Sequence, residues 1–293
     1  MGALVFYLFY GVNWVITLLP MRILYILSDF LYLLLYYLIS YRRKVVAENL
    51  RNSFPEKSPE ELKIIEKKFY HHLADLMIEI LKLTHMSKES SLERMTITND
   101  ELLERLYAEG RDVIAVIGHY NNWEWLKSLI FHTEFQTVSI YKPLQNKYFD
   151  NFLLRLRNRE GMILTPMSLI VREIIEARKS NRRTIYSFIT DQTPPKGDIK
   201  YWTKFLNQDT PVYLGVEKIA SKYDMAIVFF NVKKIRRGYY SYNPELLFEH
   251  TSGLPEYVIT ESHVRRLEEI IREQPEYWIW SHRRWKHKKP AGI

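Results

Sequence analysis

The chain has 293 residues, 47% of them hydrophobic and 14% aromatic, which is enough to bury the core of one large domain or two ordinary ones. It contains no cysteine, so disulfides, thiolate catalysis and cysteine-based zinc sites are excluded. The 42 Lys and Arg residues outnumber the 34 Asp and Glu residues, and the net charge of +8 favours an anionic partner such as a phospholipid surface, an acidic protein or a nucleic acid.

The first predicted element is an almost uninterrupted apolar stretch from Leu4 to Ile39. One proline and two charged residues interrupt it, so neither half supplies the roughly 20 clean residues of a spanning helix. We expect residues 1–40 to form a hydrophobic membrane anchor, as a hairpin, an interfacial pair of helices or one tilted span. A pair of buried core helices is the alternative. The basic cluster Tyr41-Arg42-Arg43-Lys44 then marks the cytoplasmic side of the anchor.

Residues 41–293 are predicted to form one further domain, which opens with a long helix. The segment Ser58-Pro59-Glu60-Glu61 has the pattern of a capping box, and apolar residues recur behind it at steps of three and four. His71, His72 and Asp75 lie near the apolar face of this helix and are residue types that bind metal ions. Without a further set of ligands, solvated helix residues are the favoured interpretation, and no metal site is predicted.

From residue 111 onward, short β-branched runs alternate with helical stretches, which predicts an α/β domain with a mainly parallel central sheet flanked by helices. The predicted strands are Val113–Ile117, Thr137–Tyr141, Thr184–Ile189 and Ala226–Val232, with Tyr239–Glu249 as an antiparallel edge strand. The predicted helices are Asn121–His132, Asn146–Arg159, Ser168–Lys179 and Pro211–Tyr223, followed by an amphipathic helix that ends near Gln274.

The segment from Val113 to Glu124 is a buried strand that ends on Gly118-His119 and turns into a helix. Catalytic groups collect at the carboxyl ends of strands in open α/β sheets. A histidine there can act as a general base near neutral pH, and a carboxylate one turn further on can orient its imidazole. His119 and Glu124 are therefore the candidate catalytic residues. The alternative is a histidine at a helix entry beside an exposed glutamate.

The segment His119-Tyr120-Asn121-Asn122-Trp123-Glu124 resembles the His-x4-Asp/Glu motif of glycerolipid acyltransferases. More specifically, the chain resembles the late, or secondary, acyltransferases of lipid A biosynthesis. Five further blocks match in the same order, and they are Tyr41-Arg42-Arg43-Lys44, Tyr141-Lys142-Pro143, Arg157-x-Arg159-x-Gly161, Asp191-Gln192 and the closing segment from Pro275 to Lys286.

The resemblance implies a glycerol-3-phosphate acyltransferase-like fold and transfer of a fatty acyl group from acyl carrier protein to a hydroxyl of a lipid A precursor. It implies no cofactor. His119 would take the proton of the acceptor hydroxyl and Glu124 would hold the imidazole in the useful tautomer. The location implied is the bacterial inner membrane, with the catalytic domain on the cytoplasmic side.

Four further residues are candidates for contact with substrate. Lys142, Arg157 and Arg159 could bind lipid phosphates, and Arg159 or backbone amides near Gly118 could stabilise the charge that develops on the carbonyl oxygen. Asp191 follows a predicted strand, so it falls on the same rim of the sheet as His119 if the sheet is parallel. A turn with a purely structural role is the alternative for Asp191.

Two other functions stay open. One is acyl transfer to another glycolipid or an amino lipid, in which His119 and Glu124 keep their roles. The other is a non-catalytic membrane-surface protein. Nucleic-acid binding is not predicted, because the basic residues accompany an apolar anchor and no recognised binding motif.

Overall fold

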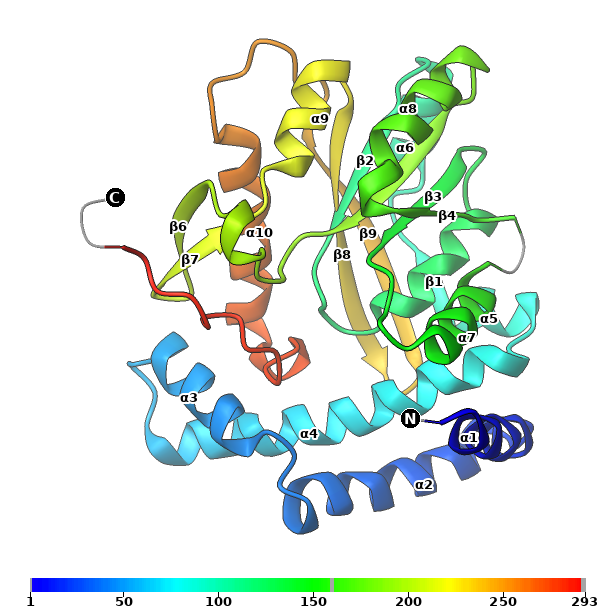
Figure 1. Ribbon diagram of the computed structural model, residues 1–293, viewed down its shortest axis with the longest axis vertical. Coiled ribbons are helices and arrows are strands. Elements are labelled where there is room, and N and C mark those ends of the chain that lie inside the picture. The colour runs from blue at the N-terminus through cyan, green and yellow to red at the C-terminus, as the bar shows by residue number, and fades with distance from the viewer. Residues whose placement is uncertain (1, 159–160, 291–293) are drawn as a thin grey trace.

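A computed structural model describes residues 2–158 and 161–290, which form a central sheet with helices on both faces and an N-terminal layer of helices along one side (Figure 1). The strands are β1 Met95–Ile97, β2 Val113–Ile117, β3 Gln136–Tyr141, β4 Ile163–Pro166, β5 Thr184–Ile189, β6 Tyr201–Phe205, β7 Gln208–Val212, β8 Ala226–Arg236 and β9 Tyr239–Phe248. The predicted fold class, α/β with a mainly parallel sheet, is confirmed.

The α-helices are α1 Ala3–Ile16, α2 Met21–Leu33, α3 Arg43–Ser53, α4 Pro59–Lys82, α5 Lys88–Arg94, α6 Glu101–Ala108, α7 Lys147–Arg157, α8 Ile170–Lys179, α9 Gly215–Tyr223 and α10 Val258–Glu273. A π-helical segment, η1 Leu34–Leu38, continues α2. The 3₁₀ segments are η2 Leu83–His85, η3 Trp123–Phe131, η4 Met167–Leu169, η5 Lys196–Asp198 and η6 Pro275–Tyr277.

The large sheet has seven strands in the order β1-β9-β8-β2-β5-β3-β4, and β6 and β7 form a separate hairpin. Every pairing in the large sheet is parallel except that between β8 and β9. The antiparallel direction predicted for the strand near Tyr239 is therefore right. Its edge position is wrong, because the short strand β1 pairs in parallel with the outer side of β9 and covers it.

Strand β2 lies at the centre of the sheet, between β5 and β8. All five of its residues are buried, because helices pack on both faces of the sheet. Ile114 and Val116 belong to a core shared with α4, α9 and α10, whereas Val113, Ala115 and Ile117 belong to a core shared with α6, α7 and η3. A central strand buried on both faces holds the loop that follows it in a fixed place.

Helix α4 begins as the sequence predicts. The Ser58 hydroxyl accepts a hydrogen bond from the Glu61 amide, and the Glu61 carboxylate accepts one from the Ser58 amide, which completes the capping box. Such a cap contributes about 1 kcal/mol to stability. The interpretation of the histidines further along α4 as solvated is wrong for His72 and also for Asp75, since both are buried beneath neighbouring elements.

The prediction of a helix from Pro211 to Tyr223 differs from the structure in its first residues. The segment at Pro211 is not helical, because it pairs with Trp202 in the β6–β7 hairpin, and α9 begins only at Gly215. Leu206 and Asn207 form the tight turn of this hairpin, both with positive φ. Glycine and asparagine normally provide that conformation, so a leucine there gives little warning of the turn.

The N-terminal layer consists of α1, α2 and η1. The helical stretch Met21–Leu38 is long and apolar enough to cross a membrane by length and composition, and 28% of it is buried. Figure 1 shows α2 running beside α4. Helix α1 packs on α7, where the Phe6 ring contacts the rings of Tyr148 and Phe149. The N-terminal helices thus cover the body of the protein along one side.

Candidate active site

His119 stands two residues beyond the carboxyl end of β2. Gly118 separates it from the strand and lies so close to α10 that a Cβ there would be 2.5 Å from the Leu267 Cδ1 atom. Behind His119, Asn121 takes a positive φ of 52°, which asparagine tolerates better than most residues. The backbone N–H of Asn121 donates to the Tyr277 carbonyl, so the C-terminal segment also holds the loop in place.

Asp191 lies directly across from His119. Strands β2 and β5 are parallel neighbours with Ile117 opposite Ile189, and His119 and Asp191 each follow two residues later. The Asp191 Oδ1 atom lies 2.6 Å from His119 Nδ1, and Oδ2 accepts a hydrogen bond of 2.8 Å from the His119 amide. The Trp278 indole donates a further bond of 2.8 Å to Oδ2. The sequence therefore placed Asp191 on the correct rim.

The environment keeps the Asp191 carboxyl ionised. Burial raises its pKa, but the neighbouring charge of His119 and the hydrogen bonds from His119 and Trp278 outweigh burial and bring the pKa to about 2, from 3.8. Because the pKa of Asp191 is lower in the folded protein, its ionised carboxylate stabilises the fold above pH 3.8, and this stabilisation is lost as the pH falls towards 2. A carboxylate that accepts from Nδ1–H leaves His119 Nε2 with its lone pair.

Nε2 of His119 faces the residue that follows Asp191. The Gln192 Nε2 atom lies 3.1 Å from it, and the Trp123 ring packs edge-on at 4.8 Å between ring centroids. The Gln192 side chain is exposed, so a substrate hydroxyl can take its place at Nε2.

Glu124 does not take the place that the sequence predicted for it. Its carboxylate accepts a hydrogen bond of 3.0 Å from Arg157 Nε and a second from the other end of the same guanidinium. Among the described residues, the carboxylate bonded to His119 is that of Asp191 and not that of Glu124. The expectation that Glu124 orients the imidazole is therefore corrected, because Glu124 in η3 turns towards α7.

A cleft of about 460 Å³ opens in front of His119. Its polar wall carries His119, Glu124 and Arg157, with the exposed side chain of Lys142 at the side. Much of the remaining wall is apolar, as in pockets that bind hydrocarbon, and includes Ile117, Leu126, Leu129, Ile140, Leu153, Leu154, Met162 and Phe188. The structure thus brings His119, Glu124, Arg157 and Lys142 to one cleft. Arg159 lies outside the described residues.

The basic C-terminal tail is largely structural. Arg284 is buried and donates to the Pro211 carbonyl over 2.8 Å, while Thr193 donates to the Arg284 carbonyl. Burial lowers the pKa of the Arg284 guanidinium to about 10, and burial also lowers the pKa of His282 to about 4. These side chains fix the loop after Asp191 from behind.

Two residues that support the site were not predicted. Trp278 donates to Asp191, and Glu79 of α4 accepts from Asn122 Nδ2 over 2.7 Å. Asn122 in turn accepts from the Trp125 amide and begins η3. In the sequence, Glu79 is one of many positions in a long amphipathic helix. The only sign that it has a buried role is that a charged residue stands there among apolar neighbours.

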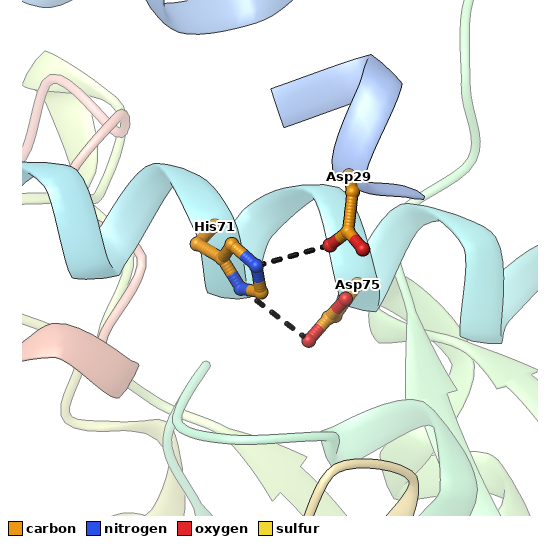
Figure 2. A group of neighbouring side chains, drawn as sticks. All are labelled: Asp29, His71 and Asp75. Carbon is orange, nitrogen blue, oxygen red and sulfur yellow. Dashed lines mark ion pairs between the residues drawn. The ribbon is translucent and has the colours of Figure 1, made fainter. Parts of the chain in front are cut away.

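One group of described residues has the composition of a metal site, namely Asp29, His71 and Asp75, whose ligand atoms lie within 4.8 Å of one another (Figure 2). Cationic side chains of the protein already balance these carboxylates. Arg237 donates to Asp75 over 2.9 Å and also to Asp29, and the Lys234 ammonium lies 3.5 Å from Asp75. We therefore interpret these residues as an ion-pair cluster that joins α2, α4 and the β8–β9 hairpin.

Substituting Gly118 by alanine should destabilise the fold by about 1–3 kcal/mol, because the new methyl group would overlap the buried Leu267 side chain. Denaturant unfolding of the detergent-solubilised protein measures this change. Gly197→Ala is the matched control, since nothing lies within 4 Å of a Cβ at that position. Equal stability of the two variants would contradict the close packing described for Gly118.

The fold and the site together define an α/β protein with a histidine–aspartate pair at the carboxyl edge of its sheet and a largely apolar cleft beside the histidine. The family model of bacterial lipid A biosynthesis acyltransferases matches residues 2–287, so the chain belongs to that family. The family assigned from the sequence motifs is thereby confirmed, and with it acyl transfer in lipid A biosynthesis. A comparison with curated proteins found no match.

Proposed function

We propose that the protein moves a fatty acyl group from acyl carrier protein to a hydroxyl of a lipid A precursor at the cytoplasmic face of the bacterial inner membrane. The observation that carries this proposal is His119, bonded through Nδ1 to a buried carboxylate at 2.6 Å and exposed to an apolar cleft on its other side. That geometry suits a base that serves a lipid hydroxyl.

In the proposed reaction, His119 Nε2 accepts the proton of the acceptor hydroxyl while the hydroxyl oxygen attacks the carbonyl carbon of the thioester. Collapse of the tetrahedral intermediate breaks the C–S bond, and the imidazolium returns its proton to the departing thiolate. Asp191 keeps a proton on Nδ1 and stabilises the imidazolium between the two steps. The reaction proposed here requires no cofactor.

We assign Glu124 an indirect part in the reaction. Its ion pair with Arg157 fixes the guanidinium at the wall of the cleft, where Arg157 and Lys142 can bind the phosphates of the acceptor. Arg159 and the amides at the start of η3 are the proposed donors to the developing oxyanion. The net charge of +8 supports anionic partners.

The direct test incubates the purified full-length protein with an acyl carrier protein thioester and a panel of lipid acceptors, with mass spectrometry of the products. Transfer to the lipid A precursor is the expected result. Transfer only to other glycolipids or amino lipids would contradict the acceptor, and transfer to none of them would contradict the donor or the activity. Lipid A from cells that lack the gene should lack one acyl chain.

A further inference from the structure

The outward side of the N-terminal layer is apolar. Leu4, Leu8, Ile26, Phe30 and Leu38 are between 67% and 83% exposed, and most of their outward-facing neighbours in α1, α2 and η1 are apolar as well. A continuous surface of this kind is rare on a protein surrounded by water, and it marks a site that contacts a partner or a membrane.

Two polar side chains of α1 and α2 point the opposite way. Asn13 of α1 is buried and donates to Thr84, and Ser28 of α2 is buried and donates to Asp75 over 2.7 Å. A surface helix in water shows the reverse pattern, with polar residues outside and apolar residues inside. Polar groups that face the protein while apolar groups face outward are typical of helices in contact with lipid.

Helix α2 and η1 are attached side by side to α4 along their length (Figure 1). Tyr25 donates to Glu79 over 2.7 Å near the C-terminal end of α4, and the Tyr36 ring packs against Tyr70 at 5.4 Å between centroids nearer its N-terminal end. The Asp29–His71 ion pair of 3.1 Å lies between these contacts (Figure 2). If α2 crossed a bilayer, it would therefore take α4 and its charged residues into the hydrocarbon.

The turn between α1 and α2 is attached to the body as well. The Lys82 ammonium donates to the carbonyls of Thr17 and Leu19 over 2.7 and 3.0 Å. The Thr17 hydroxyl lies 2.9 Å from His85 Nδ1. These contacts hold the turn against the C-terminal end of α4, on the same side of a membrane as the sheet, and they are incompatible with a hairpin that places this turn on the opposite side.

We propose that α1, α2 and η1 lie in the plane of one leaflet of an anionic phospholipid bilayer, with their outer faces buried at the boundary of headgroups and acyl chains. This inference rests on the membrane association in the proposed function, and it replaces the spanning arrangement with an in-plane one. Arg22 in α2 and Arg42 and Lys44 just after η1 are exposed, and their charges complement the phosphates of such a leaflet.

The in-plane arrangement gives the lipid acceptor a short path to His119. Phe6 of α1 stacks on Tyr148 at 5.4 Å and meets Phe149 at 5.3 Å, both residues of α7. The other side of α7 lines the cleft with Leu153 and Leu154. A single helix thus separates the leaflet from the cleft, and an acceptor can enter laterally without leaving the membrane.

Because the chain has no cysteine, single cysteines introduced at Leu8, Ile26, Phe30 and Leu38 can each carry one spin label. In vesicles of phosphatidylethanolamine and phosphatidylglycerol, all four labels should lie at a similar depth, about 5–10 Å into the boundary region. A spanning helix would separate the labels at Ile26 and Leu38 by about 18 Å in depth, at 1.5 Å per residue. That separation would overturn the inference.

The side of the turn is tested with Leu18→Cys and a membrane-impermeant maleimide, in vesicles that carry the catalytic domain outside. The same labelling before and after the vesicles are opened supports the in-plane arrangement, and labelling that requires opening overturns it. Lys179→Cys, at the exposed end of α8, is the matched control and should label in both cases. Thermal unfolding of each variant checks that it is folded.

The acyl-transfer assay in the same vesicles separates the two proposals. A spanning depth profile with normal transfer would overturn the in-plane inference alone. A uniform shallow depth without any acyl transfer by the unsubstituted protein would overturn the proposed function alone. Protein that remains in the aqueous phase would overturn both.

Discussion

The His119→Ala variant should lose at least about two powers of ten in the turnover of acyl transfer, while its fold stays intact. The reason is that the acceptor hydroxyl loses the base that takes its proton, and the departing thiolate loses the acid that supplies one. Steady-state assays with an acyl carrier protein thioester measure the loss, and circular dichroism checks the fold.

The matched control for this variant is His250→Ala. His250 is 67% exposed, lies outside the cleft and pairs with Asp224 at the surface, so its removal should leave turnover unchanged. Near-normal turnover in His119→Ala would refute the proposed mechanism. A parallel loss in both variants would show that the assay responds to changes in the fold and not to the base.

The sequence predicted the position of His119 because a purely local signal was enough. A run of β-branched and aliphatic residues that ends on Gly118-His119 defines both the strand and its carboxyl end. The start of α4 was predicted for the same reason, since the capping box involves only neighbours in sequence. Local patterns of this type survive in the folded protein when tertiary contacts agree with them.

For the carboxylate that bonds to His119, the sequence predicted only that Asp191 lies on the same edge of the sheet, and not that the two residues are in contact. Asp191 meets His119 because β5 lies directly beside β2 in matching register, and strand order is determined by packing of the whole domain. Glu124 was the nearer candidate in sequence. It points elsewhere because Asn121 adopts a positive φ and η3 is a 3₁₀ segment, whose pitch differs from that of the α-helix assumed in the prediction.

The Asp191→Asn variant should lower turnover by about 10³- to 10⁴-fold with little change in structure. Asp191 Oδ2 accepts from two N–H donors, the His119 amide and the Trp278 indole, so the amide oxygen of asparagine must stay on that side. The new NH₂ group then replaces Oδ1 opposite His119 Nδ1. The imidazole has to accept there, which moves its proton to Nε2 and blocks the base.

The comparison that decides between the two carboxylates is Glu124→Gln, which should weaken acceptor binding through Arg157 and raise KM more than it lowers kcat. Nitrogen NMR of the labelled His119 ring should report the changed tautomer in Asp191→Asn and the original tautomer in Glu124→Gln. A merely structural role of Asp191 would leave the tautomer unchanged. If Glu124→Gln changes the tautomer and Asp191→Asn does not, Glu124 orients the histidine, as the sequence motif had suggested.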